Sequence, residues 1–285
     1  MISTAAPALP HRVIRPPSKG VSLGLAEVWE FRDLLQTLAA RDVKLRYRQT
    51  VLGVLWVVLQ PLLTAAIFAF VFGKVAGLQA GGVDYFCFAF AGQLAWTAFS
   101  QTLVRSSSSL LLNAPLVAKV FFPRLVLPLS TVYSTTIDVG VGLIALGAIM
   151  LLKGQPTAWG LVALPVWLLL LAAMGLGIGM AAAAFAVSYR DVGMIVPVVV
   201  QLGTYLSPVG WPLAEFSQRY GADRVGLYLL LNPAAALIEA CRWSLFGRAS
   251  VPWGYVLYAA FAALTVLLVG ILVFRAQERR FADVI

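Results

Sequence analysis

The chain has 285 residues, of which 61% are hydrophobic and only 12% are charged, with a formal net charge of +9 and a mean hydropathy of +0.89. Soluble domains carry about 25% charged residues, so this composition excludes a water-soluble globule. The charged residues lie in clusters and leave long uncharged stretches, which predicts a multi-pass membrane protein.

Residues 1–22 are rich in proline and basic residues, and no apolar run precedes the first long hydrophobic stretch. A cleavable signal peptide needs such a run, so we expect a flexible cytoplasmic leader here. In a membrane protein, the excess of basic residues is interpreted by its position along the chain. The positive charge therefore does not predict a nucleic-acid partner.

The segment 23–48 has the pattern of an amphipathic helix. Its apolar residues recur at three- and four-residue spacing, at Val28, Phe31, Leu35 and Leu38. A basic cluster comes directly after them, at Arg41, Lys44, Arg46 and Arg48. We expect this helix to lie in the plane of the cytoplasmic headgroups, held by anionic lipid. The alternative, packing on a soluble domain, finds no such domain in this chain.

The rest of the chain, 49–285, is expected to form a domain of six transmembrane helices. Each uncharged stretch has the roughly 20 residues that a helix needs to cross about 30 Å of hydrocarbon. The stretches are 49–73, 85–104, 125–152, 154–189, 192–214 and 249–274, the third being interrupted by Asp138. When both termini are placed in the cytoplasm, the cytoplasmic segments carry most of the lysines and arginines, as the positive-inside rule requires.

A shorter uncharged run, 225–238, lies between the fifth and sixth spans and contains Pro233. It is too short for an ordinary crossing, so we interpret it as a re-entrant or interfacial segment. Counting it as a seventh span would also place the C-terminal arginines outside. The external loop 212–252 is therefore expected to be semi-buried.

Aromatic residues of the second span share one helix face with Gly92. Such a stripe is typical either of helix packing and lipid contact or of a surface for the apolar faces of sugar rings. On the third span, Ser130, Ser134 and Asp138 are spaced by four. A carboxylate at that depth costs about 2.5–3.5 kcal/mol on insertion scales, so it should face protein or water. It either serves a functional site or bonds a neighbouring helix.

The fifth span carries a weaker polar face, and the sixth is almost wholly apolar. We therefore expect spans two, three and five to line a translocation path and the sixth to face lipid. The residues of the predicted path are Tyr85, Phe88, Trp96, Phe99, Ser130, Ser134, Asp138, Gln201 and Tyr205. In the fourth span, Gly175, Gly177 and Gly179 predict close helix packing.

Several kinds of chemistry have no residues to support them. The sequence contains no phosphate loop of the form G-x-x-x-x-G-K-[ST], no H-E-x-x-H and no G-x-S-x-G, and its single histidine, His11, lies in the leader. Paired carboxylates of a proton relay are also missing from the predicted spans. Energy for transport is therefore expected from another subunit, and no metal or other cofactor is expected in this chain.

A run near the first span carries a family resemblance. It reads RDVKLRYRQTVLGVLW over residues 41–56 and continues to Gln60-Pro61. Further motifs follow in order: Phe122-Pro123-Arg124 with Leu127-Pro128-Leu129, Tyr189-Arg190-Asp191-Val192, and Asn232-Pro233 with Arg242. Over about residues 24–280 the chain resembles the type-2 ABC export permeases for polysaccharides and polyol phosphates, the membrane subunits that export O-antigen, capsule or teichoic acid.

The resemblance implies six helices per subunit, a homodimer around a central conduit, and two copies of a separate ATPase that bind ATP and Mg. It implies that 23–48 is an interface helix, 106–122 a coupling segment and 212–252 an external gate loop. The residues implied in ATPase coupling are Asn113, Lys119, Phe122, Pro123, Arg124, Arg190 and Asp191. Those implied in the interface and the gate are Arg41, Arg46, Tyr47, Trp56, Asn232, Pro233 and Arg242.

The expected function is export of a lipid-linked glycan across the bacterial cytoplasmic (inner) membrane, where membrane lipids and the ATPase are the other partners. Two alternatives remain open. One is a permease of the same scaffold that exports a drug or a small lipid. The other is a membrane-embedded sugar transferase or assembly factor, which would work without an ATPase and would need an activated catalytic acid.

Overall fold

The computed structural model describes residues 25–47, 53, 55–247 and 253–284. All regular elements in these ranges are helices, which confirms the predicted all-α fold class. They are α1 (Leu25–Glu30), α2 (Arg32–Tyr47), α3 (Leu55–Phe68) with its π-helical continuation η1 (Ala69–Val75), α4 (Tyr85–Leu112), α5 (Ala114–Lys119), α6 (Val126–Leu152), η2 (Trp159–Ala163), α7 (Leu164–Ala186), α8 (Asp191–Leu206), α9 (Leu213–Tyr220), α10 (Ala222–Leu231), α11 (Pro233–Phe246) and α12 (Trp253–Val284).

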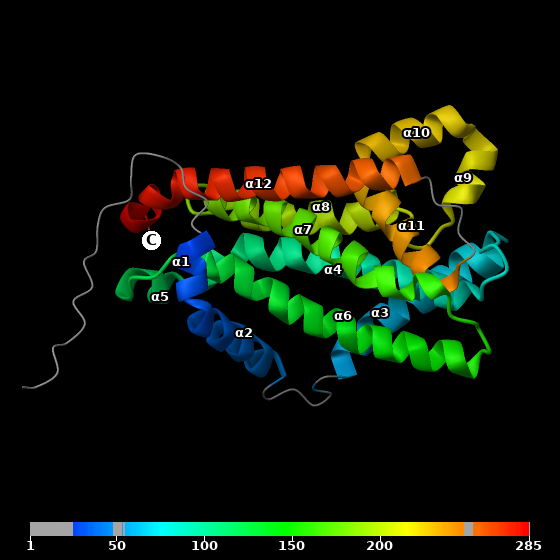
Figure 1. Cartoon of the computed structure of the whole chain (residues 1–285), viewed down its shortest axis with the longest axis horizontal. Coiled ribbons are helices and arrows are strands. Elements are labelled where there is room, and N and C mark those ends of the chain that lie inside the picture. The colour runs from blue at the N-terminus through cyan, green and yellow to red at the C-terminus, as the bar shows by residue number, and fades with distance from the viewer. Residues whose placement is uncertain (1–24, 48–52, 54, 248–252, 285) are drawn as a thin grey trace, which may run out of the picture.

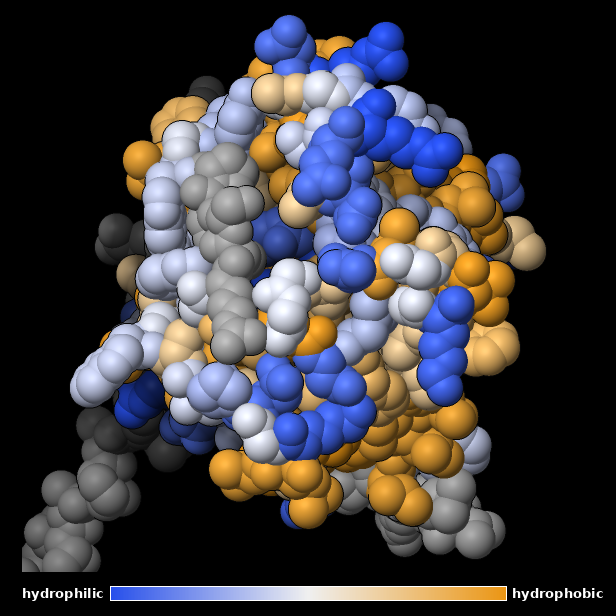
Figure 2. Space-filling model, turned by 90° about the vertical axis from the view of Figure 1, so that its right-hand side faces the viewer, coloured by the Kyte–Doolittle hydropathy of each residue, from blue (hydrophilic) through white to orange (hydrophobic). Residues whose placement is uncertain are grey.

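The long helices run side by side in a bundle with two distinct ends (Figure 1). One end, here the α5 end, carries α1, α2, α5 and the C-terminal part of α12. The opposite end, here the α9 end, carries η1, α9 and α10. Seen from the α9 end, hydrophilic side chains gather over the end of the bundle and hydrophobic ones lie around its circumference (Figure 2).

Among the described helices, four are long and apolar enough to cross a membrane. They are Leu55–Val75, Val126–Leu152, Trp159–Ala186 and Trp253–Glu278. Helix α4 has 28 residues but carries many polar side chains, and α8 has only 16 residues. The helices α10 and α11 meet at 106°, the geometry of a broken span or a re-entrant loop. The all-helical bundle and the bent pair agree with the sequence analysis, whereas the count of six spans stays a prediction.

Helix α4 occupies the centre of the bundle and packs most extensively against α7 and α6. Glycines allow this close approach, because a side chain at Gly175 or Gly179 would collide with the backbone of α4. On the opposite face of α7, Gly177 meets the backbone of α12 in the same way, and Gly270 of α12 meets Gly177. The predicted role of the three α7 glycines in close packing is confirmed.

The N-terminal amphipathic segment is divided at Phe31 into α1 and α2. Its apolar face packs on the α5 end of the bundle, against a cluster that includes Leu110, Phe122 and Phe274. Leu38 is buried in this cluster, and the apolar residues Val28, Phe31 and Leu35 pack against it. The sequence alone does not indicate this packing surface for the amphipathic segment, because the residues that form it come from distant parts of the chain.

Ion pairs fasten the α5 end. Arg275 of α12 contacts Glu27 of α1 at 3.0 Å and Glu278 at 3.2 Å. Glu278 in turn accepts hydrogen bonds from Arg124, which follows α5. The chain's last helix therefore joins α1 to the segment after α5.

Candidate functional site

A polar cavity of about 640 Å³ lies between α3, α4, α6 and α8. We call it the groove. The described residues that line it are Gly53, Trp56, Val57, Gln60, Pro61, Thr64, Gln93, Trp96, Thr97, Ser100, Gln101, Val104, Arg105, Asp138, Pro197, Val200, Gln201 and Thr204. Amides, hydroxyls and two indoles thus form the wall of a cavity among mostly apolar helices.

Helical periodicity places these polar side chains in the groove. On α4, Gln93, Thr97, Gln101 and Arg105 recur at four-residue spacing and therefore share one face. A pair on α3 repeats the four-residue spacing, Gln60 with Thr64, and a pair on α8 has three-residue spacing, Gln201 with Thr204, which also places both on one helix face.

The threonine hydroxyls of the groove donate to carbonyls of their own helices. Thr97 donates to Gln93 at 2.7 Å, Thr64 to Gln60 at 3.1 Å and Thr204 to Val200 at 3.2 Å. Because each hydroxyl oxygen keeps its acceptor lone pairs, it presents an acceptor toward the groove. The glutamine amides add both donors and acceptors, so the wall matches a ligand rich in hydroxyl groups.

An ion pair in the wall of the groove joins Arg105 of α4 to Asp138 of α6, with an N–O distance of 2.6 Å. The same guanidinium donates to Thr135 at 3.1 Å and to Ser134 at 3.5 Å. The pair answers the requirement that a carboxylate within a span face a partner.

Sequence reasoning missed Arg105 as that partner, because it took the first charge after the second span as its cytoplasmic boundary. Helix α4 in fact continues to Leu112. The four-residue spacing from Gln93 to Arg105 was the signal that could have found it.

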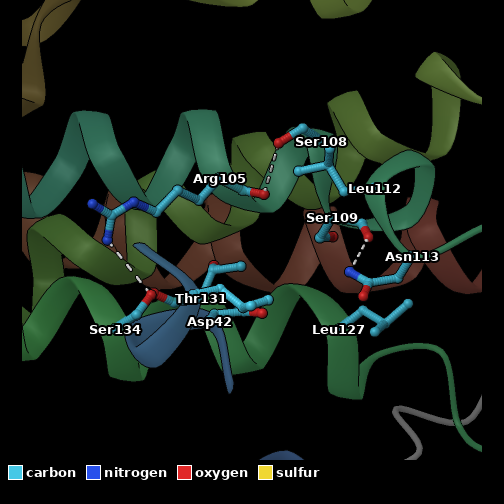
Figure 3. Close-up of a pocket in the computed structure, with 10 residues that line it drawn as sticks. Asp42, Arg105, Ser108, Ser109, Leu112, Asn113, Leu127, Thr131 and Ser134 are labelled. Atoms are coloured by element: carbon cyan, nitrogen blue, oxygen red, sulfur yellow. Dashed lines mark hydrogen bonds between the residues drawn. The ribbon is translucent and has the colours of Figure 1, made fainter. Parts of the chain in front are cut away.

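A second cavity of about 370 Å³ lies between α2, α4 and α6, and Arg105 lines both cavities. Its wall is rich in hydroxyl groups, and the lining residues shown in Figure 3 are Asp42, Arg105, Ser108, Ser109, Leu112, Asn113, Leu127, Thr131 and Ser134. The close-up shows the Arg105 side chain extending toward Ser134 and the Asn113 amide toward Ser109. The two cavities therefore share the side chain of Arg105, and the second cavity extends from it to α2.

The predicted path residues fall into two groups. Trp96, Asp138 and Gln201 line the groove, and Ser134 lines the second cavity beside it. Phe99 lies behind Trp96, with 5.1 Å between the ring centroids. In the same region, Ser130 is buried and donates to the carbonyl of Leu127.

The other three lie nearer the α9 end or outside the groove wall. The Tyr85 hydroxyl donates to the carbonyl of Gly210, and the Phe88 ring lies under the Arg242 guanidinium, 3.6 Å from its carbon. Tyr205 is 62% exposed and meets Phe68 edge-on. In this structure the aromatic stripe of the second span is thus divided between the groove and the α9 end.

Arg242 lies inside the protein, although the sequence places it in the predicted external loop 212–252. Its side chain is 1% exposed and pairs with Glu239 of α11 at 2.5 Å. It also donates to the carbonyl oxygens of Phe88 and Val209. A side chain at Gly92 would overlap the guanidinium, so this glycine makes room for it. Arg242 therefore fastens the bent pair to α4 and to the segment after α8.

The remaining interface and gate residues are spread along the bundle. Trp56 lines the groove, Asn232 donates to Ser207 at 2.9 Å, and Pro233 is the first residue of α11. Arg41 of α2 donates to Asn113 at 2.6 Å, which joins the interface helix to the end of α4. Arg46 and Tyr47 end α2, and their side chains lie outside the described part of the chain.

The predicted coupling residues gather at the α5 end. Asn113 separates α4 from α5, and Lys119 ends α5 with an exposed side chain. Phe122 and Pro123 are buried, and Arg124 bonds Glu278. Arg190 immediately precedes α8. Asp191 lies in the first turn of α8, where its negative charge interacts favourably with the helix dipole.

Comparison with known proteins assigns the family, because residues 33–246 match the family described as ABC-2 type transporter. The chain belongs to the ABC-2 type transporter family. This chain is thus a membrane transport subunit and not an enzyme. The family resemblance of the sequence motifs is confirmed.

Individual relatives show which kinds of exporter within this family the chain is similar to. The O-antigen export system permease protein RfbA of Myxococcus xanthus is 29% identical over 258 residues, covering 90% of this chain and 97% of the relative. A protein with the same name from Klebsiella pneumoniae is 26% identical, covering 89% and 95%. The polysialic acid transport protein KpsM of Escherichia coli is 22% identical, covering 86% and 93%. This ABC-2 permease is therefore related to bacterial exporters of O-antigen and polysialic acid.

Proposed function

We propose that this ABC-2 permease is the membrane-spanning subunit of an ATP-driven exporter that moves a lipid-linked polysaccharide across the bacterial cytoplasmic membrane. The observation that supports this most directly is the groove. Its amides and hydroxyl acceptors suit sugar hydroxyls, and the half-exposed ring of Trp56 suits the apolar face of a sugar ring. The names of the relatives support the same substrate class.

The groove lies on one side of a single subunit, between α3 and α8. Two such half-channels facing each other across a twofold axis enclose a conduit wide enough for a glycan chain, so the functional unit is a homodimer. The exposed apolar residues of α12, among them Leu257 and Phe261, face lipid in this arrangement. The sugar then passes through the conduit while its lipid carrier stays in the bilayer.

Two copies of a separate ATPase bind at the α5 end, which is the cytoplasmic end and carries α1 and the C-terminal part of α12. ATP and Mg are bound by those ATPases, and this chain contributes no cofactor site. The coupling segment 106–122 contains the last turns of α4, the whole of α5 and the three residues after it, so a push on α5 reaches α4 directly. The hydrogen bond from Arg41 to Asn113 passes the same movement to α2.

Transport by the reconstituted complex tests the proposal. The permease is placed in proteoliposomes with its partner ATPase, and the ATP-dependent appearance of lipid-linked glycan in the opposite leaflet is measured. Trp56→Ala is expected to lower transport at least about tenfold, because it removes a half-exposed stacking surface from the groove. Trp159→Ala is the matched control. Trp159 belongs to η2, is 98% exposed and is not among the described residues that line the groove.

Unchanged transport in Trp56→Ala would remove the groove from the path. Stimulation of the complex by small amphiphiles but not by glycan precursors would favour export of a drug or a small lipid. Glycan modification by the chain without any ATPase would favour the transferase alternative.

A further inference from the structure

The central helix α4 is open to its surroundings along one strip. Between Cys87 and Leu110, the residues of this helix that are not buried are Gln93, Thr97, Gln101, Val104, Arg105 and Ser108. Each of them lines the groove or the second cavity. A ligand in the groove therefore meets α4 along this strip.

Four glutamines line the groove, and the described residues provide no hydrogen bond to any of their side-chain amides. They lie on three helices: Gln60 on α3, Gln93 and Gln101 on α4, and Gln201 on α8. An amide without a partner inside the protein offers its carbonyl oxygen and its N–H donors to a ligand. The groove thus holds several uncommitted amides that come from different helices.

Gln93 differs from the other three glutamines. Its amide oxygen is buried and has no hydrogen-bond partner in the part of the chain that the structure describes. The hydroxyl one turn along the helix, that of Thr97, donates to the backbone carbonyl of Gln93 at 2.7 Å and so is not available to the amide. Buried polar atoms in proteins nearly always have a partner, because an unpaired one has lost its hydration without replacement. The exception at Gln93 therefore calls for an explanation.

One other described side chain has a buried atom without a partner, the Nε of Arg275. The other nitrogens of that guanidinium pair with Glu27 and Glu278, so Arg275 is held by its ion pairs. The amide of Gln93 has no such bonds. Its last side-chain torsion is soft and has two favoured orientations, and a half turn exchanges the oxygen with the nitrogen. Since the side chain is only partly buried and lines the groove, this turn carries the oxygen to the groove side.

We propose that Gln93 is the residue of the groove that recognises the glycan, and that its amide forms a hydrogen bond with a sugar hydroxyl that no described residue replaces. This inference rests on the proposed function, and it adds the residue that contacts the sugar chain and the kind of contact. Because sugar hydroxyls both donate and accept hydrogen bonds, one such amide pairs with successive sugars as the chain advances. Loss of the amide should therefore stabilise the protein and weaken its hold on the glycan.

The test replaces the amide by a side chain of the same length. Gln93→Met removes both polar atoms, and the buried oxygen has no partner to lose. The variant complex in lipid nanodiscs is therefore expected to melt about 2–4 °C above the wild type. Lipid-linked glycan extracted from the cells that make this protein serves as the substrate. At low glycan concentration, ATP-dependent transport by Gln93→Met is expected to fall about tenfold, which corresponds to one lost hydrogen bond.

Gln155→Met is the matched control. Gln155 is also only partly buried, but it is not among the described residues that line the groove, and its amide has no buried atom without a partner. This variant is expected to keep the wild-type melting temperature and the wild-type transport rate.

The opposite signs of the two effects separate contact with the glycan from a role in packing. A residue that only holds the bundle together lowers the melting temperature and transport in parallel. A lower melting temperature for Gln93→Met, or its failure to fold, therefore overturns the inference. A higher melting temperature with unchanged transport also overturns it and leaves the proposed function standing. Absence of transport by the wild type overturns the proposed function as well.

Melting temperatures with and without the extracted glycan give a second measurement. A ligand that binds the folded protein raises its melting temperature by an amount that depends on affinity. We expect a smaller rise for Gln93→Met than for the wild type and for Gln155→Met. An equal rise in all three proteins would exclude a glycan contact at Gln93.

Discussion

The bundle contains two arginine–carboxylate pairs of similar geometry in different surroundings. Arg242 and Glu239 contact each other at 2.5 Å with side chains 1% and 7% exposed. Arg105 and Asp138 contact each other at 2.6 Å with side chains 20% and 6% exposed. The first pair is enclosed by protein, whereas the second forms part of a cavity wall.

The surroundings assign the two pairs different work. The Arg242 guanidinium also bonds two backbone carbonyls and lies on the Phe88 ring, so the pair holds α4, α11 and the segment after α8 in one arrangement. The Arg105 guanidinium bonds hydroxyls of α6 and lines two cavities, where a ligand can reach it. The same kind of pair is enclosed by protein in one place and open to a ligand in the other.

The largest expected effect comes from breaking the enclosed pair. Arg242→Met leaves the buried Glu239 carboxylate without its counter-ion, which costs about 3–5 kcal/mol in known buried pairs. We expect a large loss of thermal stability for the purified protein in detergent. The double variant Arg242→Met with Glu239→Gln is expected to recover most of it, and equal destabilisation of single and double variants would show that charge is not the cause.

A smaller loss is expected from crowding the same pair. In Gly92→Ala the added methyl group meets the Arg242 guanidinium and the carbonyl of Val209. Overpacking of this kind costs about 1–3 kcal/mol. Gly140→Ala is the matched control, because a methyl group there meets no neighbouring atom and alanine favours the helix. Equal melting temperatures for the two variants would contradict the role given to Gly92.

The groove pair is expected to matter less for stability. Asp138→Asn leaves Arg105 partly exposed and still bonded to Thr135, so the loss should be about 1–3 kcal/mol, between the values for exposed and buried pairs. Thermal unfolding measured beside Arg242→Met checks this order. Destabilisation as large as in Arg242→Met would erase the distinction between the two pairs.

The smallest effect comes from an ion pair at the α9 end, between Asp84 and Lys153 at 2.7 Å. Partial burial would raise the pKa of Asp84. The hydrogen bonds from Lys153 and Cys87, together with the positive charge of Lys153, outweigh this effect and hold the pKa below its ordinary value of 3.8. A lowered pKa stabilises the folded state above the ordinary value, and this contribution is lost as the pH falls through the folded-state pKa.

Both side chains of this pair are about one third or more exposed, so the contribution is about 0.2–1 kcal/mol. Asp84→Asn should lower stability slightly at pH 7, and the difference from wild type should vanish at strongly acidic pH. Melting temperatures measured over that pH range check the sign. A difference that grows toward acidic pH would contradict the assignment.

The helical class and the polar faces were predictable because they depend on local spacing. Four-residue repeats placed Asp138 and Gln201 on polar faces without knowledge of the neighbours. The same signal was present on α3, where Gln60 and Thr64 are four residues apart, and it was overlooked because the span was identified only by its lack of charged residues. Helix α3 therefore entered the groove wall only with the structure.

The surroundings of Arg242 could not be predicted in this way. Glu239 lies only three residues before Arg242, but the two backbone carbonyls that Arg242 bonds, of Phe88 and Val209, come from distant parts of the chain. A charge between two hydrophobic stretches predicts a position outside the membrane, and only tertiary packing reverses this expectation. The predicted end of the second span at residue 104 was not the end of its helix. The serines after Arg105 continue α4 to Leu112, and no proline interrupts the chain before Pro115.

The central claim, that a glycan passes along the groove, is tested most directly by site-specific photo-crosslinking during transport. A benzophenone amino acid replaces Gln201 in the groove or, as a control, Phe261 on the exposed face of α12. Both variants are reconstituted with the partner ATPase and a labelled lipid-linked glycan. We predict ATP-dependent crosslinks from position 201 to the sugar chain and none from position 261. Crosslinks to sugar from position 261 alone would contradict the account.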